Sequence, residues 1–302
     1  MTTPSSLPQA SLPAGAPLQG PVGVVGLGLI GGSLGLDLQQ RGLEVRALVH
    51  RAATAERARQ RGLAQAVDTD PTVLAGCRLV VLALPLDRLL TPPASLLAAL
   101  PSEAVVTDVG SVKAPVLQLW RGLHPRFVAS HPMAGSSEAG VEAGRRDLFR
   151  GRPWVATPEA GGDARALAAV RALAEAVGAC WITCGAAAHD QAVALISHLP
   201  VLASAALLLA ADSGAAGGPP EQDLPRLARV LASSGFADST RVGAGNPELG
   251  VLMARCNREA LVAALAGYRR CLDGFEQLLI AEDWPALEAE LSRCRQLRPH
   301  FL

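Results

Sequence analysis

The sequence predicts a parallel, doubly wound α/β domain followed by an all-helical domain. Short apolar runs alternate with helix-like segments from residue 21 to residue 185, which is the pattern of strand–helix–strand units. A glycine-rich turn joins the first strand to the first helix. No convincing strand pattern follows residue 185, so we divide the chain into an α/β domain at 21–185 and a helical domain at 186–302.

Seven segments of the α/β domain have strand character. In chain order they are residues 21–26, 44–51, 77–85, 103–111, 126–132, 152–158 and 179–184. The third is apolar almost throughout, as expected of a parallel strand covered on both faces. Helices are predicted over residues 31–42, 54–62 and 163–178.

Four segments of the second domain have helical patterns. They are residues 186–212, 224–235, 247–280 and 284–297, with a loop rich in Gly and Pro at 212–222. The run LPVLASAALLLAA is apolar almost all round, so a helix there must be buried on every side. In a small domain a second copy of the chain buries it most easily, which favours a homodimer.

Composition argues against several classes of function. The chain has 302 residues, 50% of them hydrophobic, and its zero net charge gives no sign of nucleic-acid or lipid binding. Its longest apolar runs, 22–36 and 199–211, are shorter than the roughly 20 residues of a membrane span. Six cysteines form no C-x-x-C pair, which indicates free thiols in a reducing cytoplasm, and no metal-ligand cluster is visible. Residues 1–20 lack Lys and Arg and are predicted to be a disordered tail.

The glycine-rich turn reads GLGLIG, in which Gly26, Gly28 and Gly31 form G-x-G-x-x-G. It follows a strand and opens a helix, which is the context of a Rossmann-type dinucleotide site. The glycines allow close approach of a pyrophosphate, and the helix N-terminus supplies N–H groups. We therefore expect a cofactor to contact this turn, including Leu29 and Ile30. The alternative is a Gly-rich turn that binds nothing.

The end of the second strand favours NADP over NAD. NAD sites usually place an acid there for the ribose hydroxyls, whereas this strand ends in His50 and Arg51. An arginine can pair with the 2′-phosphate of NADP, which an acid would repel. An ordinary surface arginine is the alternative, and NAD remains open as the cofactor.

Two polar clusters follow later strands at the carboxyl edge of the sheet, where open α/β sheets bind ligands. TDVGSVK contains Asp108, Ser111 and Lys113, of which Ser111 is placed to contact nicotinamide or substrate. A loop that caps the next helix is the alternative. In SHPMAG, His131 can accept a proton from an alcohol as hydride leaves the carbon. The alternative is a histidine hydrogen-bonded within a loop.

The helical domain carries two further groups of candidates. AHDQAVALISHLP contains His189, Asp190 and His198, of which His198 either lines the cleft or packs in the core. In SSGFADSTRVGAGNPELG, Arg241 lies near Asp238 in a segment that we interpret as a long polar loop. We interpret Arg241 as a carboxylate clamp, with an Arg–Asp surface pair as the alternative.

The chain resembles the prephenate/arogenate dehydrogenase family of tyrosine biosynthesis over roughly residues 21–290. Five stretches carry the resemblance in the same order: GLGLIGGSL, DVGSVK, SHPMAG, HDQAVALISHLP and SSGFADSTRVGAGNPELG. The chain looks most similar to the short, single-function arogenate dehydrogenases of cyanobacteria. The resemblance implies that hydride passes from a cyclohexadiene alcohol to nicotinamide, that carbon dioxide leaves and that the ring becomes aromatic.

The resemblance also implies roles for individual residues. It makes His131 the histidine that deprotonates the 4-hydroxyl group, and Ser111 the serine that orients the hydroxyl, the histidine and the nicotinamide. It makes Arg241 the residue that binds the side-chain carboxylate, and it places His198 in the same cleft. It further implies that the helical domain dimerises.

Two departures from the family pattern favour arogenate, which has an ammonium group where prephenate has a keto oxygen. Many users of prephenate read HLPH, whereas Val201 replaces the second histidine here. Ser137 stands where some prephenate enzymes have an acid. A nearby acid, Glu138 or Asp238, is our candidate for binding the ammonium group.

The expected function is NADP-dependent oxidative decarboxylation of L-arogenate to L-tyrosine by a cytoplasmic homodimer. The nearest alternative is the same reaction on prephenate, with NAD or NADP. Two others are a dehydrogenase of similar plan, such as a β-hydroxyacid dehydrogenase or a pyrroline carboxylate reductase, and a non-catalytic NADP-binding regulator. A non-catalytic regulator would not require His131 as a general base.

Overall fold

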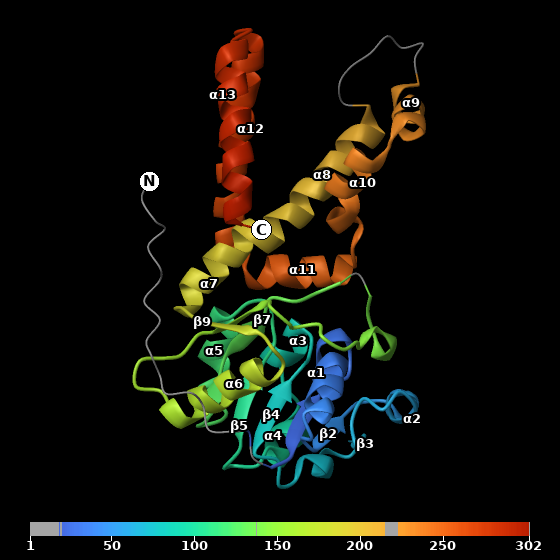
Figure 1. The fold of residues 1–302 in the computed structure, drawn as a ribbon, viewed down its shortest axis with the longest axis vertical. Coiled ribbons are helices and arrows are strands. Elements are labelled where there is room, and N and C mark those ends of the chain that lie inside the picture. Colours follow the sequence, from blue (N-terminus) through green and yellow to red (C-terminus); the bar gives the residue numbers. More distant parts are fainter. Residues whose placement is uncertain (1–17, 19, 137, 215–222, 302) are drawn as a thin grey trace.

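Figure 1 shows a domain built around a sheet that carries a separate array of helices, which confirms the fold class predicted from the sequence. The structure is a computed structural model that describes residues 18, 20–136, 138–214 and 223–301. Ser137 and, apart from Leu18 and Gly20, the predicted N-terminal tail lie outside the described residues.

The larger sheet has six strands. They are β1 (Val22–Val25), β2 (Val45–Leu48), β3 (Ala66–Asp68), β4 (Leu79–Leu82), β5 (Val105–Asp108) and β6 (Phe127–Val128). Their spatial order is β3-β2-β1-β4-β5-β6 and every neighbouring pair is parallel. The direction of winding reverses between β1 and β4, and such a switch point opens a ligand crevice at the carboxyl ends of the strands.

Helices cover both faces of this sheet. They are α1 (Leu29–Gln40), α2 (Ala52–Gln60), α3 (Leu86–Leu90), α4 (Ala94–Ala99), α5 (Ala114–Trp120) and α6 (Ala164–Ala176), with short 3-10 turns at Pro71–Leu74 and Val141–Ala143. Successive strand residues point to opposite faces. Val24 therefore packs with Leu34 of α1 and Leu173 of α6, whereas Val25 lies in a second core with Trp120 of α5.

A second, smaller sheet consists of β7 (Ser130–Pro132), β8 (Pro153–Ala156) and β9 (Cys180–Thr183). β7 is antiparallel to β8, and β8 is parallel to β9. The prediction of one strand over 126–132 is wrong, because the chain leaves the larger sheet after Val128. The Ser130 N–H then donates to the Asp108 carboxylate at 3.1 Å. The sequence also does not predict β3, whose three residues are too few to show a pattern.

The second domain contains only helices among its described residues. They are α7 (Ala186–Val193), a π-helical turn (Ala194–His198), α8 (Leu199–Ser213), α9 (Leu224–Leu231), α10 (Ser234–Thr240), α11 (Pro247–Cys256), α12 (Arg258–Ile280) and α13 (Trp284–Leu297), with 3-10 turns at Arg241–Ala244 and Arg298–His300. Two predictions are wrong here. The expected polar loop around Arg241 contains α10 and a 3-10 turn, and the expected single helix over 247–280 breaks at Asn257.

The π-helical turn before His198 has a local cause. Pro200 has no backbone N–H and its ring crowds the preceding turn of a helix. The chain runs from α7 into α8 without leaving the helical path, and it widens into the π-helical turn that ends at His198. Turns of this kind occur frequently at functional sites, and this one sets the direction of a candidate site residue.

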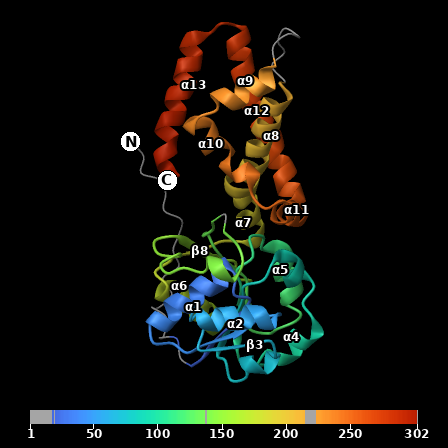
Figure 2. The same ribbon diagram turned by 90° about the vertical axis from the view of Figure 1, so that its right-hand side faces the viewer.

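The helical domain buries little of its apolar surface within one chain. Its core cluster contains four buried residues, Ala194, Leu199, Leu261 and Ala264, and Val193 and Met253 are the other buried apolar residues among those described. Neither α9 nor α13 has a buried residue, and Leu209 of α8 and Ile280 of α12 are 70% and 69% exposed. Figures 1 and 2 show α8 and the α12–α13 hairpin extending away from the sheets. Apolar helices exposed to this extent require a partner surface.

The continuous helix from Ala186 to Ser213 also bears on the membrane prediction. It has 28 residues and a mean hydropathy of 2.1, and 28% of its most apolar window is buried. By length and composition it is the one helix among the described residues that could cross a bilayer. The expectation that the apolar runs are too short for a span therefore does not hold for the complete helix.

Buried Asp37 provides a test of stability in the α/β domain. Its Oδ1 accepts the Asp147 N–H at 3.0 Å, its Oδ2 has no partner among the described residues, and burial raises its pKa. A raised pKa means that the folded state loses stability as pH rises above the ordinary value of 3.8. Asp37→Asn should therefore raise the free energy of unfolding at pH 7 by about 1 kcal/mol. In thermal unfolding this gain corresponds to a rise in Tm of about 2–4 °C.

The matched control is Asp70→Asn, because Asp70 is an exposed helix cap and Asn caps equally well. Its Tm should not change. The Tm difference between Asp37→Asn and the wild type should shrink as pH falls toward 4. An unchanged or lower Tm for Asp37→Asn at pH 7 contradicts the account.

Candidate active site

The turn between β1 and α1 is tight at two glycines and open at the third. Gly26 has a φ of +94°, and a Cβ at Gly31 would lie 1.9 Å from the Gly26 carbonyl oxygen. A Cβ at Gly28 would have no atom within 4 Å, so the backbone there can be approached from outside. The N-terminal N–H groups of α1, which begins at Leu29 and Ile30, receive no side-chain cap. This arrangement fits the pyrophosphate of a dinucleotide.

The end of β2 lies beside this turn, because the Gly26 N–H donates to the Leu48 carbonyl at 2.9 Å. His50 and Arg51 follow β2 and are exposed, and Arg51 is the N-cap residue of α2. No described residue pairs with the Arg51 guanidinium. Both residues therefore lie where the adenosine ribose of a dinucleotide is bound in folds of this type.

His131 begins a chain of hydrogen bonds that crosses from β7 to α7. Its Nδ1 lies 3.0 Å from His189 Nε2, and His189 Nδ1 lies 2.8 Å from Asp190 Oδ1. The Asp190 carboxylate also accepts the backbone N–H groups of Lys113 at 2.7 Å and Ala114 at 2.8 Å. The chain thus links the first turn of α5 to His131 through two buried side chains of α7.

The protons in this chain have one consistent arrangement. Asp190 is an acceptor, so His189 Nδ1 carries a proton and the Nε2 of the neutral ring carries a lone pair. His131 Nδ1 must then donate to His189, which leaves the lone pair of His131 on Nε2. His131 is therefore held in the tautomer that can accept a proton at Nε2.

The surroundings of His131 also keep it neutral. The side chain is partly accessible, yet protein surrounds most of it, and this desolvation lowers its pKa well below the ordinary 6.5. The positive charge of Lys113 lowers the pKa further, with smaller effects of His189 and His198. A neutral imidazole at neutral pH is the form that a general base requires.

Asp108 and Lys113 bind the backbone of Ser130, the residue that precedes His131. Both are fully buried and form an ion pair, and Lys113 Nζ also donates to the Ser130 carbonyl at 2.7 Å. Asp108 accepts the N–H groups of Gly110 at 2.8 Å and Ser130 at 3.1 Å. The pair joins the loop after β5 to the strand that carries His131, so these two residues hold the site together.

His198 is completely buried and is linked to Asp190 through Asn257. Its Nδ1 lies 3.2 Å from the side-chain amide of Asn257, which also donates to the Asp190 backbone carbonyl at 2.7 Å. Burial lowers the pKa of His198 to about 4, so its ring is neutral at pH 7. The sequence gives no signal for Asn257, because the helical periodicity continues across it.

The remaining candidates are not brought into contact with His131 among the described residues. Ser111 is half-buried in the loop between β5 and α5, at the carboxyl edge of the sheet. Arg241 and Glu138 are exposed and their charged groups have no described partner. The roles of these three residues remain predictions, as does that of Ser137, which lies outside the described residues.

Comparisons with known proteins place both domains in one family. Residues 34–183 match the family description "Prephenate dehydrogenase, nucleotide-binding domain", and residues 185–293 match "Prephenate dehydrogenase, dimerization domain". A curated relative, the cyclohexadienyl dehydrogenase of Zymomonas mobilis, is 28% identical over 87% of this chain and 89% of its own length.

Two solved structures are similar over nearly the whole chain. The arogenate dehydrogenase of Synechocystis is 40% identical with a TM-score of 0.79, and the match covers 93% of this chain and all of that one. The prephenate dehydrogenase of A. aeolicus, in complex with hydroxyphenyl propionate and NAD+, is 26% identical with a TM-score of 0.84, and the match covers 94% and 99% of the two chains.

Proposed function

The chain belongs to the prephenate and arogenate dehydrogenase family of tyrosine biosynthesis, and from this premise we propose that it converts L-arogenate to L-tyrosine with NADP. The observation that carries the proposal is the hydrogen-bonded chain that holds His131 as a neutral base. It lies at the sheet edge that also carries the dinucleotide turn. The alternatives are the same reaction on prephenate and the use of NAD.

In the proposed reaction His131 Nε2 accepts the proton of the 4-hydroxyl group. A bound nicotinamide supplies the acceptor for the hydride that leaves the same carbon. Loss of the ring carboxylate as carbon dioxide then makes the ring aromatic. Ser111 orients the hydroxyl group, and Arg241 binds the side-chain carboxylate. Desolvation of His131 strengthens its own contact with the hydroxyl group, since polar groups interact more strongly away from water.

The choice of arogenate rests on charge and on similarity. Val201 removes an imidazole found in many users of prephenate, and Glu138 is an exposed carboxylate that can bind an ammonium group. The Synechocystis arogenate dehydrogenase is also the more similar of the two solved structures in sequence.

The test is the appearance of reduced cofactor with arogenate or prephenate, each with NADP or NAD. Turnover of arogenate with NADP alone supports the full proposal. Preference for prephenate, or equal use of NAD, overturns the substrate or cofactor choice and leaves the family assignment intact. No turnover in any combination overturns the enzymatic proposal in favour of a regulator.

The cofactor proposal predicts the effect of Arg51→Asp. Loss of a charged hydrogen bond to the 2′-phosphate, with repulsion by the new acid, should lower kcat/KM for NADP by about 10–100-fold. The same carboxylate can accept the ribose hydroxyls of NAD, so kcat/KM for NAD should not fall. Arg165→Asp, another exposed arginine remote from the turn, is the control and should change neither value. Equal losses with both cofactors would remove Arg51 from the choice.

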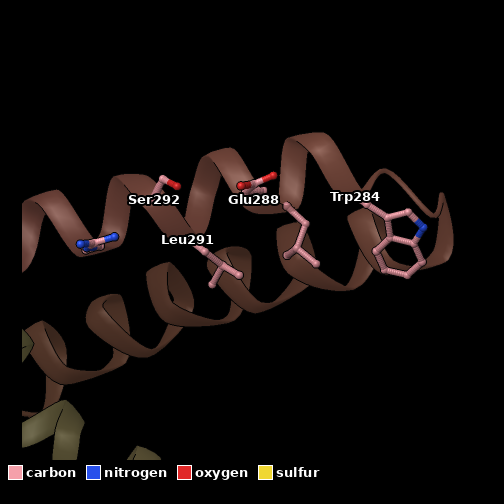
Figure 3. Close-up of a pocket in the computed structure, with 6 residues that line it drawn as sticks. Trp284, Glu288, Leu291 and Ser292 are labelled. Carbon is pink, nitrogen blue, oxygen red and sulfur yellow. The ribbon is translucent and has the colours of Figure 1, made fainter.

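We further propose that the chain is a cytoplasmic homodimer in which the helical domain supplies the interface. The second matched family segment is a dimerization domain, and the apolar helices that extend from it lack cover in one chain. Figure 3 shows one such face on α13, where Trp284 and Leu291 line an open hollow. A second copy accounts for the apolar length of α7 and α8 without a bilayer.

A further inference from the structure

Asn257 occupies the corner where the predicted helix over 247–280 breaks into α11 and α12. Its backbone has a φ of −125° and a ψ of 34°, outside the helical region, and its side chain caps neither helix. The buried amide instead donates to the Asp190 carbonyl at 2.7 Å and lies 3.2 Å from His198 Nδ1. Both described contacts of this amide are therefore with residues of the candidate site, Asp190 and His198.

These contacts determine where His198 carries its proton. The Asp190 carbonyl is only an acceptor, so the amide must present its NH2 group to it. The second hydrogen of that group points to His198 Nδ1, which must accept it. His198 is neutral because burial lowers its pKa to about 4. A neutral ring that accepts at Nδ1 carries its proton on Nε2.

The resulting Nε2–H of His198 is buried and has no partner among the described residues. A buried donor without an acceptor destabilises the structure that contains it. The ring is linked to His131 through described contacts. Asn257 bridges His198 Nδ1 and the Asp190 carbonyl, and the Asp190 carboxylate leads through His189 to His131 Nδ1. A buried unsatisfied donor that belongs to the same network as the proton acceptor of the proposed reaction indicates a group that is satisfied by a ligand.

We propose that Asn257 is a positioning residue that holds His198 as an Nε2–H donor, and that the acceptor is an oxygen of the bound substrate. This inference rests on the proposed function. The two imidazoles then have opposite roles. The Asp190–His189 chain leaves His131 with a lone pair at Nε2, whereas Asn257 leaves His198 with a proton at Nε2. Asp190 joins both arrangements, through its carboxylate and through its backbone carbonyl.

Nitrogen NMR of histidine-labelled full-length protein tests the tautomer directly. The His198 signals are identified by their absence in His198→Gln. In the wild type, His198 should carry its proton on Nε2, and Asn257→Leu should abolish this preference. The control is Asn246→Ala, which removes the cap of α11 in the same domain and should leave the His198 tautomer unchanged. A proton on Nδ1 in the wild type overturns the proposal.

Kinetics with a matched pair of variants test the donor. The amide of His198→Gln can place an N–H near the position of Nε2, whereas the amide of His198→Asn ends near Nδ1. His198→Asn and Asn257→Leu should lower kcat/KM for arogenate by about 10-fold, the value of one hydrogen bond. His198→Gln should recover most of the activity that His198→Asn loses, and Asn246→Ala should match the wild type. Equal losses in both His198 variants overturn the donor role.

The two measurements separate this inference from the proposed function. Absence of arogenate turnover in the wild type overturns the proposed function, while NMR still reports whether Asn257 sets the tautomer. A second outcome is that the wild type turns over arogenate and His198 carries its proton on Nε2, but His198→Gln and His198→Asn lose the same kcat/KM. That result leaves the proposed function intact and overturns the contact between His198 and the substrate.

Discussion

His131→Asn is expected to lower kcat for arogenate by about 10²–10⁴, the usual contribution of a general base. Asparagine is smaller than histidine and can still donate to His189, but it cannot take up a proton at neutral pH. The cofactor turn between β1 and α1 does not involve His131, so the affinity for NADP should not change. Steady-state kinetics and fluorescence titration of NADPH measure the two quantities.

The control for this variant is His300→Asn, since His300 is an exposed histidine at the end of the helical domain. It should retain full activity. A His131→Asn protein that turns over arogenate at the wild-type rate would contradict the role of His131. Weakened NADPH binding in the variant would indicate that His131 also supports the cofactor site.

The same histidine predicts the pH dependence of the wild type. The pKa of His131 lies well below 6.5, because burial and Lys113 disfavour the charged ring. A base is active when it is neutral, so kcat/KM should stay constant as pH falls to 6.5 and should decrease only below it. A decrease centred at or above 6.5 would show that another group controls the reaction.

The sequence best predicts where a candidate residue lies in the fold when a short motif follows directly on a strand. Gly26 directly follows β1, so the doubly wound topology places it at the carboxyl edge of the larger sheet. His131 lies in β7 of the smaller sheet, and the bond from the Ser130 N–H to Asp108 at the end of β5 holds β7 beside that edge. Ser111 follows β5 in the same way. Local pattern and global fold agree at these positions, and for that reason they can be recognised without a structure.

Other features depend on packing that no local pattern reports. His189 and Asp190 are visible as polar residues, but only the approach of α7 to β7 and α5 shows what they bind. The helical periodicity of the sequence continues across Asn257, so no local pattern marks this residue. Its contacts are with residues 59 and 67 positions away in the chain. Short hydroxyl-containing helices such as α10 are missed because Ser239 and Thr240 look like loop residues, yet their hydroxyls donate to backbone carbonyls one turn earlier.

His189 is expected to matter almost as much as His131, although it does not reach the substrate in the proposed reaction. His189→Leu removes the acceptor that holds the His131 Nδ1 proton, so His131 can adopt the tautomer with no lone pair at Nε2. A wrong tautomer of a catalytic histidine can cost up to about 10⁴ in kcat. We expect kcat for arogenate to fall by about 10²–10⁴, with NADP affinity unchanged.

His189→Gln is the matched variant, because its side-chain oxygen can lie near the position of His189 Nε2 and accept the same proton. It should recover most of the activity that His189→Leu loses. If His189 acts only through His131, the double variant His131→Asn with His189→Leu should be no slower than His131→Asn alone, since residues that work as one unit are not additive. Additive losses, or equal losses in the Leu and Gln variants, would mean that His189 contributes to packing and not to the tautomer of His131.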